Sequence, residues 1–281
     1  MLDRTIAGVY PPASTFKVLV ALAALEENVI TPNTTFSCPG ALRLPSRTFH
    51  CWNRGGHGRQ NLVSALQNSC NYYFYNVGMR LGIERLLKWT RKVGAGSLTG
   101  IDLPGESAGT AAGPEWKRAR FNEGWFQGDT INYSIGQGFL LTTPLQIAQM
   151  YAVLATGYVP IPHLMSSHAG ESVKLDIDPE NLRVIKRGLD YAVSRGTGTA
   201  AGRFGVRVAG KTGTAQASRS LNHALFAGYA PADAPRYVAV AMLEGREFGG
   251  RVASPMVGQV LAHLLSHPPG DNNNVLEART F

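Results

Sequence analysis

The sequence of 281 residues lacks any apolar run of the length that a membrane crossing requires. A helix needs about 20 consecutive apolar residues to span the hydrocarbon core of a bilayer. The opening segment, residues 1–12, also has no apolar core of the kind found in a signal peptide. We therefore expect a chain that is soluble as given, and that reaches a membrane only through an anchor outside it.

The sequence has fewer acidic than basic side chains. There are 27 Lys and Arg residues against 19 Asp and Glu, which gives a formal net charge of +8. Such a balance suits nucleic acid, an anionic membrane surface or an acidic substrate, and equally a basic surface that only aids solubility. However, the chain has no dense run of Lys or Arg and no basic patch interleaved with aromatic residues. A nucleic-acid partner is therefore not predicted.

Cysteine is rare, and its odd count of three argues against a framework built only of disulfides. Cys38, Cys51 and Cys70 all lie in the first quarter of the chain, and His57 lies among them in a Gly-Gly-His-Gly turn. Three thiols and one imidazole suit a closed tetrahedral zinc site. The competing interpretation is a Cys38–Cys51 disulfide with Cys70 as a buried free thiol. We favour zinc, and His50 is a possible substitute ligand.

Apolar periodicity and capping signals predict helices in the first two thirds of the chain and again at its end. The expected helices cover residues 16–28, 61–82 with a polar interruption at 67–71, 82–94, 143–157, 179–195 and 254–267. Residues 31–60 are expected to be loops, 103–114 a flexible connection, and GTGTAAG (196–202) a turn-rich segment. Three strands are expected at 205–216, 223–231 and 236–245, the last two forming a hairpin. Helices followed by adjacent antiparallel strands indicate an α+β fold.

Ser14 and Lys17 stand three residues apart at the start of a predicted helix. A serine hydroxyl is a poor nucleophile until a base takes its proton. A lysine one helical turn away lies on the same face, and burial would favour its neutral, basic form. The pattern alone is weak, because a serine cap followed by a surface lysine is common.

Two further patterns give the first one its weight. Ser69 and Asn71 flank Cys70, and Lys211-Thr212-Gly213-Thr214 lies on a predicted strand. The glycine allows a ligand to approach the strand closely, and the lysine and hydroxyls suit an anionic group. Ser-x-x-Lys, Ser-x-Asn and Lys-Thr-Gly in this order are the signature of penicillin-recognising serine enzymes.

The chain resembles the transpeptidase domain of class B penicillin-binding proteins, most closely the rod-elongation group called penicillin-binding protein 2. The resemblance extends over residues 4–265. It is carried by GVYPPASTFK (8–17), GHGRQNLVSAL (56–66), TGIDLPGE (99–106), EWKRARF (115–121), FQGDTINYSIGQGFLLTTPLQIA (126–148), PHL (162–164) and AGKTGTAQ (209–216). It implies the penicillin-binding fold, with an antiparallel sheet flanked by helices.

The resemblance also implies a peptidoglycan D,D-transpeptidase that forms a serine acyl-enzyme, is inhibited by β-lactams and needs no cofactor for acyl transfer. Its implied catalytic residues are Ser14 as nucleophile, Lys17 as base, Ser69 as proton relay and Lys211. Its implied substrate-binding residues are Asn71, Thr212, Gly213 and Thr214. Some members hold zinc through a histidine of the Gly-His-Gly stretch and the cysteine of the Ser-x-Asn motif, which implies Cys38, Cys51, His57 and Cys70 as ligands here.

The implied setting is the periplasmic face of the bacterial inner membrane. Expected partners are the stem pentapeptide of peptidoglycan, β-lactams, a glycan polymerase of the SEDS type and rod-complex scaffold proteins. We expect a transpeptidase domain at 1–267, with the loop-rich zinc segment 31–71 inserted and the first strands of the sheet missing, and a disordered tail at 268–281. The alternatives are a serine β-lactamase, with Glu106, Glu115 or Glu123 as the deacylating carboxylate, and a non-catalytic β-lactam sensor or scaffold.

Overall fold

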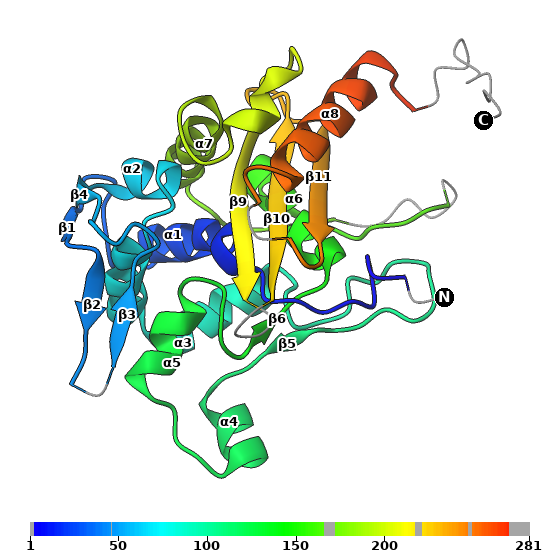
Figure 1. Ribbon diagram of the computed structural model, residues 1–281. Coiled ribbons are helices and arrows are strands. Elements are labelled where there is room, and N and C mark those ends of the chain that lie inside the picture. The colour runs from blue at the N-terminus through cyan, green and yellow to red at the C-terminus, as the bar shows by residue number, and fades with distance from the viewer. Residues whose placement is uncertain (1–2, 46, 166–171, 217–220, 247–248, 270–281) are drawn as a thin grey trace.

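An antiparallel sheet with helices on both faces forms the centre of the molecule (Figure 1). The computed structural model describes residues 3–45, 47–165, 172–216, 221–246 and 249–269. The sheet has the strand order β11-β10-β9. Its strands are β9 (Ala209–Gln216), β10 (Asn222–Ala230) and β11 (Tyr237–Leu243). All three predicted strands are present, and the α+β fold class is confirmed.

The two faces of β10 pack against different helices. Phe226 and Ala230 contact α8 (Ala253–Ser266), which lies in front of the sheet in Figure 1. Leu225, Ala227 and Tyr229 belong to the larger core on the other face. That core is formed by α1 (Lys17–Glu26), α6 (Pro144–Thr156) and α7 (Pro179–Ser194). Burial on both faces explains why β10 reads as an almost continuous apolar run.

The ends of helix α6 are fixed by capping residues that can be recognised in the local sequence. Thr143 is its N-cap, and the Thr143 hydroxyl accepts a hydrogen bond from the Gln146 amide while the Gln146 side chain bonds back to Thr143. This capping box and Pro144 at the first helical position match the prediction. Gly157 ends the helix at a φ of 83°.

Residues 31–60 are more ordered than predicted. They contain four strands of three residues each, which pair as β1 with β4 and β2 with β3. The strands are β1 (Phe36–Cys38), β2 (Ala41–Arg43), β3 (Thr48–His50) and β4 (Gly58–Gln60). Two glycines allow this segment to cross itself: a Cβ on Gly40 would lie 2.1 Å from the Arg54 carbonyl oxygen, and one on Gly56 2.3 Å from that of Cys38. Strands this short carry too few residues for a period-two pattern, so the sequence did not indicate them.

The next helical segment contains α2 (Leu62–Gln67) and the long α3 (Asn71–Lys92). Gly82 interrupts α3 with a φ of 77° and a ψ of 161°, so the two helices predicted on either side of this residue follow one another directly. The polar interruption at 67–71 is confirmed as the connection between α2 and α3.

Several short elements complete the fold. They are η1 (Ala13–Thr15), β5 (Thr110–Ala111), α4 (Pro114–Phe121), α5 (Gln127–Tyr133), β6 (Leu140–Leu141), β7 (Tyr158–Pro160), β8 (Ser172–Lys174) and η2 (Thr199–Arg203). The helices α4 and α5 were not predicted. Within the described ranges, no helix is both long enough and apolar enough to cross a bilayer. The tail predicted to be disordered falls almost wholly in 270–281, outside the described residues.

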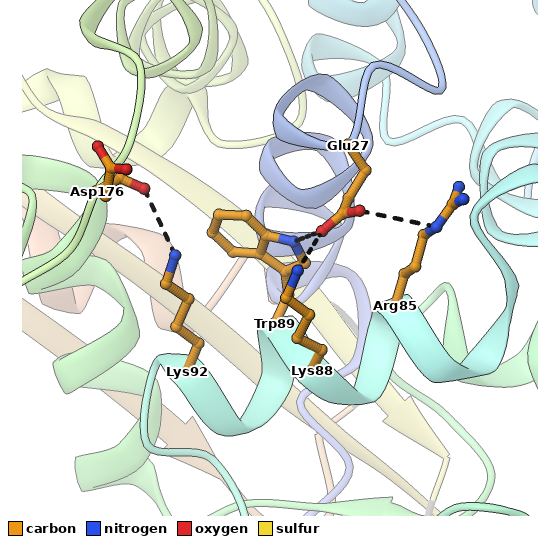
Figure 2. Close-up of polar contacts among 6 residues, drawn as sticks. All are labelled: Glu27, Arg85, Lys88, Trp89, Lys92 and Asp176. Carbon is orange, nitrogen blue, oxygen red and sulfur yellow. Dashed lines mark hydrogen bonds and ion pairs between the residues drawn. The ribbon is translucent and has the colours of Figure 1, made fainter.

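A charged cluster fastens the C-terminal end of α1 to α3 (Figure 2). The Glu27 carboxylate accepts hydrogen bonds from Trp89 Nε1 at 2.9 Å and Lys88 Nζ at 3.0 Å, and Arg85 Nε lies 3.7 Å away. Farther along α3, Lys92 Nζ donates to the Asp176 carbonyl oxygen at 3.5 Å. The contacts of Glu27 hold α1 at the end opposite to Lys17.

Candidate active site

Ser14 lies in the single turn η1, immediately before α1, and is half-buried. The backbone around it is held in an unusual conformation. Ala13 has a φ of 49°, and its N–H donates to the Gly136 carbonyl oxygen at 2.8 Å. A Cβ on Gly136, which has a φ of 69°, would lie 2.2 Å from the Ala13 carbonyl oxygen. Only glycine at 136 permits this contact, so the segment around Gly136 fixes the turn that carries Ser14.

Lys17 is the first residue of α1 and is fully buried. Its Nζ donates to Asn71 Oδ1 at 2.5 Å, the Ser69 carbonyl oxygen at 2.9 Å and Ser69 Oγ at 3.3 Å. All three acceptors are neutral oxygens. Burial therefore lowers the pKa of Lys17 to about 8, a shift that nearby Cys51 and Cys70 partly oppose. The first and second motifs are thus joined by direct hydrogen bonds.

The second motif is positioned by the connection between α2 and α3. Ser69 occupies the left-handed region with a φ of 53°, Cys70 caps α3, and Asn71 is its first residue. The Asn71 side chain also donates from Nδ2 to the His50 carbonyl oxygen at 3.4 Å. Ser69 and Asn71 reach Lys17, whereas Cys70 is fully buried among the other cysteines. Ser69 and Asn71 therefore belong to the candidate active site, and Cys70 belongs to the neighbouring group of cysteines.

The third motif lies on β9, one of the two edge strands of the sheet. Lys211 is fully buried, and its Nζ donates to the Thr212 carbonyl oxygen at 3.2 Å. Burial, and then the positive charge of Lys17, hold the pKa of Lys211 well below its usual range. This repulsion means that the two lysines are near each other in the same buried region. The first motif adjoins the same strand, since a Cβ on Gly213 would lie 3.3 Å from Thr15 Cγ2.

The hydroxyl-bearing residues of β9 lie on the opposite side of the strand from Lys211 and Gly213, because successive side chains alternate. Thr212 is almost buried, and its Oγ1 lies 2.6 Å from Thr197 Oγ1. Thr214 is exposed, and its carbonyl oxygen accepts from Gln137 Nε2 at 3.4 Å. All catalytic and substrate-binding residues predicted from the sequence therefore gather around η1, the α2–α3 connection and β9.

The glutamates considered for a β-lactamase do not join this group. The Glu106 carboxylate accepts from the Thr99 amide, the Thr99 hydroxyl and the Gly100 amide, and Glu123 lies 3.5 Å from Lys117 Nζ. Glu115 is exposed in the first turn of α4. Hydrogen bonds and ion pairs in the described part of the chain link none of these three carboxylates to a motif residue.

A cysteine–histidine cluster lies directly behind the second motif. One ligand atom from each of Cys38, Cys51, His57 and Cys70 lies within 4.8 Å of the others. His57 Nδ1 is 3.4 Å from Cys51 Sγ and 3.8 Å from Cys38 Sγ. A tetrahedral zinc ion with ordinary bond lengths would separate a sulfur from a nitrogen by about 3.6 Å. The four donors therefore fit a zinc ion, and the exposed His50 is not among them.

The thiols of the cluster are free and interact with one another. All three cysteines are free, so the structure contains no Cys38–Cys51 disulfide. The hydrogen bond from Cys70 lowers the pKa of Cys51 to about 4, while the same bond and burial raise the pKa of Cys70. His57 Nε2 is buried and has no partner among the described residues. The Cys51 and Cys70 thiols thus share one proton, which a soft divalent cation would displace on binding, because cysteine ligates a metal as the thiolate.

Sequence reasoning missed two residues that structure adds to this region. Gln137 lies in the segment 126–148, outside the three motifs, and Thr197 lies in the turn-rich segment after α7. The only local signals are the flanking glycines, Gly136 and Gly138 around one and Gly196 and Gly198 around the other.

The arrangement is that of the serine enzymes that recognise penicillin, in which three short motifs from distant parts of the chain surround one serine. Residues 1–262 match the penicillin binding protein transpeptidase domain, and the chain belongs to this family. The predicted resemblance is confirmed.

Individual curated relatives of the chain are peptidoglycan D,D-transpeptidases named MrdA. The chain is 38% identical over 311 residues to the peptidoglycan D,D-transpeptidase MrdA of Escherichia coli K12, with 99% of this chain and 48% of that protein covered. MrdA of Haemophilus influenzae is 38% identical over 298 residues, with 95% and 46% covered. The chain therefore spans about half the length of these curated relatives.

Solved structures agree with this family. The crystal structure of Pseudomonas aeruginosa PBP2 in complex with WCK 5153 matches with a TM-score of 0.86 and 37% identity, covering 94% of this chain and 61% of that chain. PBP2 of Helicobacter pylori in complex with MreC matches with a TM-score of 0.88 and 33% identity, covering 94% and 51%.

Proposed function

We propose that this chain is the catalytic domain of a peptidoglycan D,D-transpeptidase that works through an acyl-enzyme on Ser14. The observation that carries the proposal is the buried Lys17, which follows Ser14 by one turn and is bound only by neutral oxygens of Ser69 and Asn71. A lysine in such surroundings has a lowered pKa and can act as a base near neutral pH. The names of the relatives supply the substrate class.

In the acylation step, Ser14 Oγ attacks the carbonyl carbon of the penultimate D-alanine of a stem pentapeptide, and its proton passes to Lys17 Nζ. The bond from that carbon to the nitrogen of the terminal D-alanine then breaks. Ser69 Oγ, which lies 3.3 Å from Lys17 Nζ, relays a proton to the leaving amine. The products are free D-alanine and an ester on Ser14, so protons and electrons balance.

Lys17 must lose a proton before it can act in this way. As an ammonium group it has three donors, and Asn71 and Ser69 already accept from all three. The neutral amine keeps two donors and gains a lone pair, which can take the proton of Ser14. Burial favours that loss, because the ammonium form of Lys17 is destabilised away from water.

Substrate binding and deacylation follow from the same residues. Lys211, Thr212 and Thr214 would bind the terminal carboxylate of the donor peptide, Asn71 would orient its amide, and Gly213 would let it lie close to β9. An amine of a neighbouring stem peptide then attacks the ester carbon and forms the cross-link. The amine loses one proton to neutral Lys17 Nζ, and Lys17 passes this proton to Ser14 Oγ as the ester bond breaks. A β-lactam would acylate Ser14 in the same way, with its ring nitrogen as the leaving group.

The test is covalent labelling of the whole chain with a fluorescent penicillin, followed by release of D-alanine from a pentapeptide. We expect stoichiometric labelling that Ser14→Ala abolishes, slow turnover of the β-lactam, and D-alanine release. Rapid hydrolysis of a chromogenic β-lactam would instead support the β-lactamase alternative. Labelling at Ser14 without any D-alanine release would support a sensor or scaffold.

We also propose that Cys38, Cys51, His57 and Cys70 hold a structural zinc ion. All four protein donors would be used, so the ion supplies rigidity rather than chemistry. By fixing Cys70, it would hold Ser69 and Asn71 at Lys17. Elemental analysis of protein purified without chelator should find one zinc per chain. Cys70→Ser should lose zinc, melt at a lower temperature and label more slowly, whereas His50→Gln, which changes an exposed neighbour, should keep all three properties.

Location and partners are proposed from the relatives. PBP2 of H. pylori is solved in complex with MreC, and another similar structure, 33% identical with a TM-score of 0.83, is described as a peptidoglycan synthase complex that coordinates polymerisation and crosslinking. We assign this chain to the periplasmic face of the inner membrane, with a SEDS-type glycan polymerase and rod-complex scaffold proteins as partners. Co-purification of the full-length protein with such a polymerase would test the assignment.

A further inference from the structure

The turn that follows α7, Gly196-Thr197-Gly198, lies between the end of α2, just before the second motif, and β9, which carries the third. We infer that Thr197 is a positioning residue: its hydroxyl orients the Thr212 hydroxyl toward the carboxylate of the substrate. This inference rests on the proposed function, in which Thr212 binds that carboxylate.

The contact between the two threonines is short. Their Oγ1 atoms lie 2.6 Å apart; Thr212 is buried and Thr197 is half-buried. At this distance one hydroxyl donates its proton to the oxygen of the other, and the accepting hydroxyl keeps its own proton free to donate elsewhere. When Thr197 donates to Thr212, the proton of Thr212 is the free one. Without Thr197 the Thr212 hydroxyl loses this partner and can rotate.

Close packing on three sides fixes the turn that holds Thr197. A Cβ on Gly196 would lie 2.4 Å from the Gln67 carbonyl oxygen at the end of α2, and one on Gly198 2.9 Å from the Phe226 ring. Phe226 is the β10 residue opposite Thr212. The Gly198 amide also donates to the Ala192 carbonyl oxygen at 2.8 Å. The two glycines permit approaches that a side chain would block.

A second glycine-containing segment, at Gly250 in the connection between β11 and α8, packs against Thr197. A Cβ on Gly250 would lie 2.5 Å from the Thr197 carbonyl oxygen and 3.6 Å from Thr212 Cγ2. Ser254 Oγ donates to the Gly250 carbonyl oxygen at 2.7 Å and so holds this segment in place. Thr197 is thus fixed relative to Thr212 by backbone on both sides, which is what a positioning role requires.

The experiment compares acylation of the whole chain by benzylpenicillin, which carries a free carboxylate, and by its methyl ester, which does not. Thr197→Val should slow acylation by benzylpenicillin about fivefold, as loss of one hydrogen bond predicts. It should change the rate with the ester by less than twofold. Thr197→Ser keeps the hydroxyl and should restore the wild-type ratio.

Two further variants keep the result unambiguous. Thr199→Val changes an exposed threonine two residues away and should leave both rates unchanged. Thr197→Ala adds no bulk, so it replaces Thr197→Val if that variant melts early. An equal fall with both reagents, or no fall, would overturn the role of Thr197 while leaving the proposed function intact. Absence of acylation at Ser14 in the wild type would overturn the proposed function as well.

Discussion

The two ends of α1 hold ionisable side chains in opposite ways. At the N-terminal end, Lys17 is fully buried and bonded only to neutral oxygens, so burial destabilises its charge and lowers its pKa to about 8. At the C-terminal end, hydrogen bonds from Trp89 and Lys88 stabilise the charge of Glu27 and lower its pKa. Both shifts have the same direction, but only the first makes a group more reactive.

Backbone strain also differs between the candidate site and the rest of the described structure. Four non-glycine residues in the described ranges have a positive φ: Ala13, Asn28, Ser69 and Asn122. Asn122 is the C-cap of α4 and Asn28 follows the end of α1, and asparagine tolerates this region. Ala13 and Ser69 do not share that tolerance, and both lie in the site. Each costs on the order of 1 kcal/mol, which the surrounding packing must offset.

The largest effect is expected at the buried end of α1. Lys17→Ala removes the base and should slow acylation by a fluorescent penicillin about 10²–10⁴-fold at neutral pH. Thermal stability should not fall in proportion, since a costly buried amine is removed. Lys88→Ala, on α3 beside the other end of α1, is the matched control and should label at the wild-type rate. Near-normal labelling of Lys17→Ala would mean that another group takes the Ser14 proton.

A smaller effect is expected from pH. With a pKa of about 8, about one Lys17 in ten is neutral at pH 7. The acylation rate should therefore rise with pH and level off above pH 9, a gain of about tenfold. Glu27→Gln should show the same profile, because Glu27 lies at the far end of the helix. A rate that does not change between pH 7 and pH 9 would contradict Lys17 as the base.

The smallest effect on activity is expected from Glu27, at the C-terminal end of α1. Glu27→Gln should keep the acylation rate and lower the free energy of unfolding by about 1 kcal/mol, since it weakens one buried-side hydrogen bond and two surface ion pairs. The folded-state pKa of Glu27 lies below its unfolded value. Its contribution is therefore complete above the unfolded pKa and is lost as the pH falls through the folded-state pKa.

Thermal unfolding of the wild type and Glu27→Gln at several pH values measures this contribution. The difference between the two melting temperatures should be about 2 °C at pH 7 and should shrink below about pH 4. A slower acylation rate in Glu27→Gln would show that the two ends of α1 are coupled, and that the contrast between them is weaker than the structure indicates.

Local pattern was enough to predict much of the fold. The β9–β11 strands, the capping of α6 and the break between α2 and α3 follow from apolar periodicity, caps and polar interruptions that lie close together in sequence. The elements that were missed, such as β1 to β4 and α4, are only three to eight residues long. Tertiary contacts stabilise elements of this size, so their own sequence carries little signal.

The sequence by itself determined the motif residues proposed for the site, because three short motifs keep their residue types and order whatever the packing. Tertiary structure alone decided their chemistry. Lys17 and Asn71 are 54 residues apart in sequence, and Thr197 and Thr212 are 15 apart, yet both pairs are in hydrogen-bond contact. The burial that lowers the pKa of Lys17 and gathers three thiols around His57 depends on how distant segments pack, and no local pattern records it.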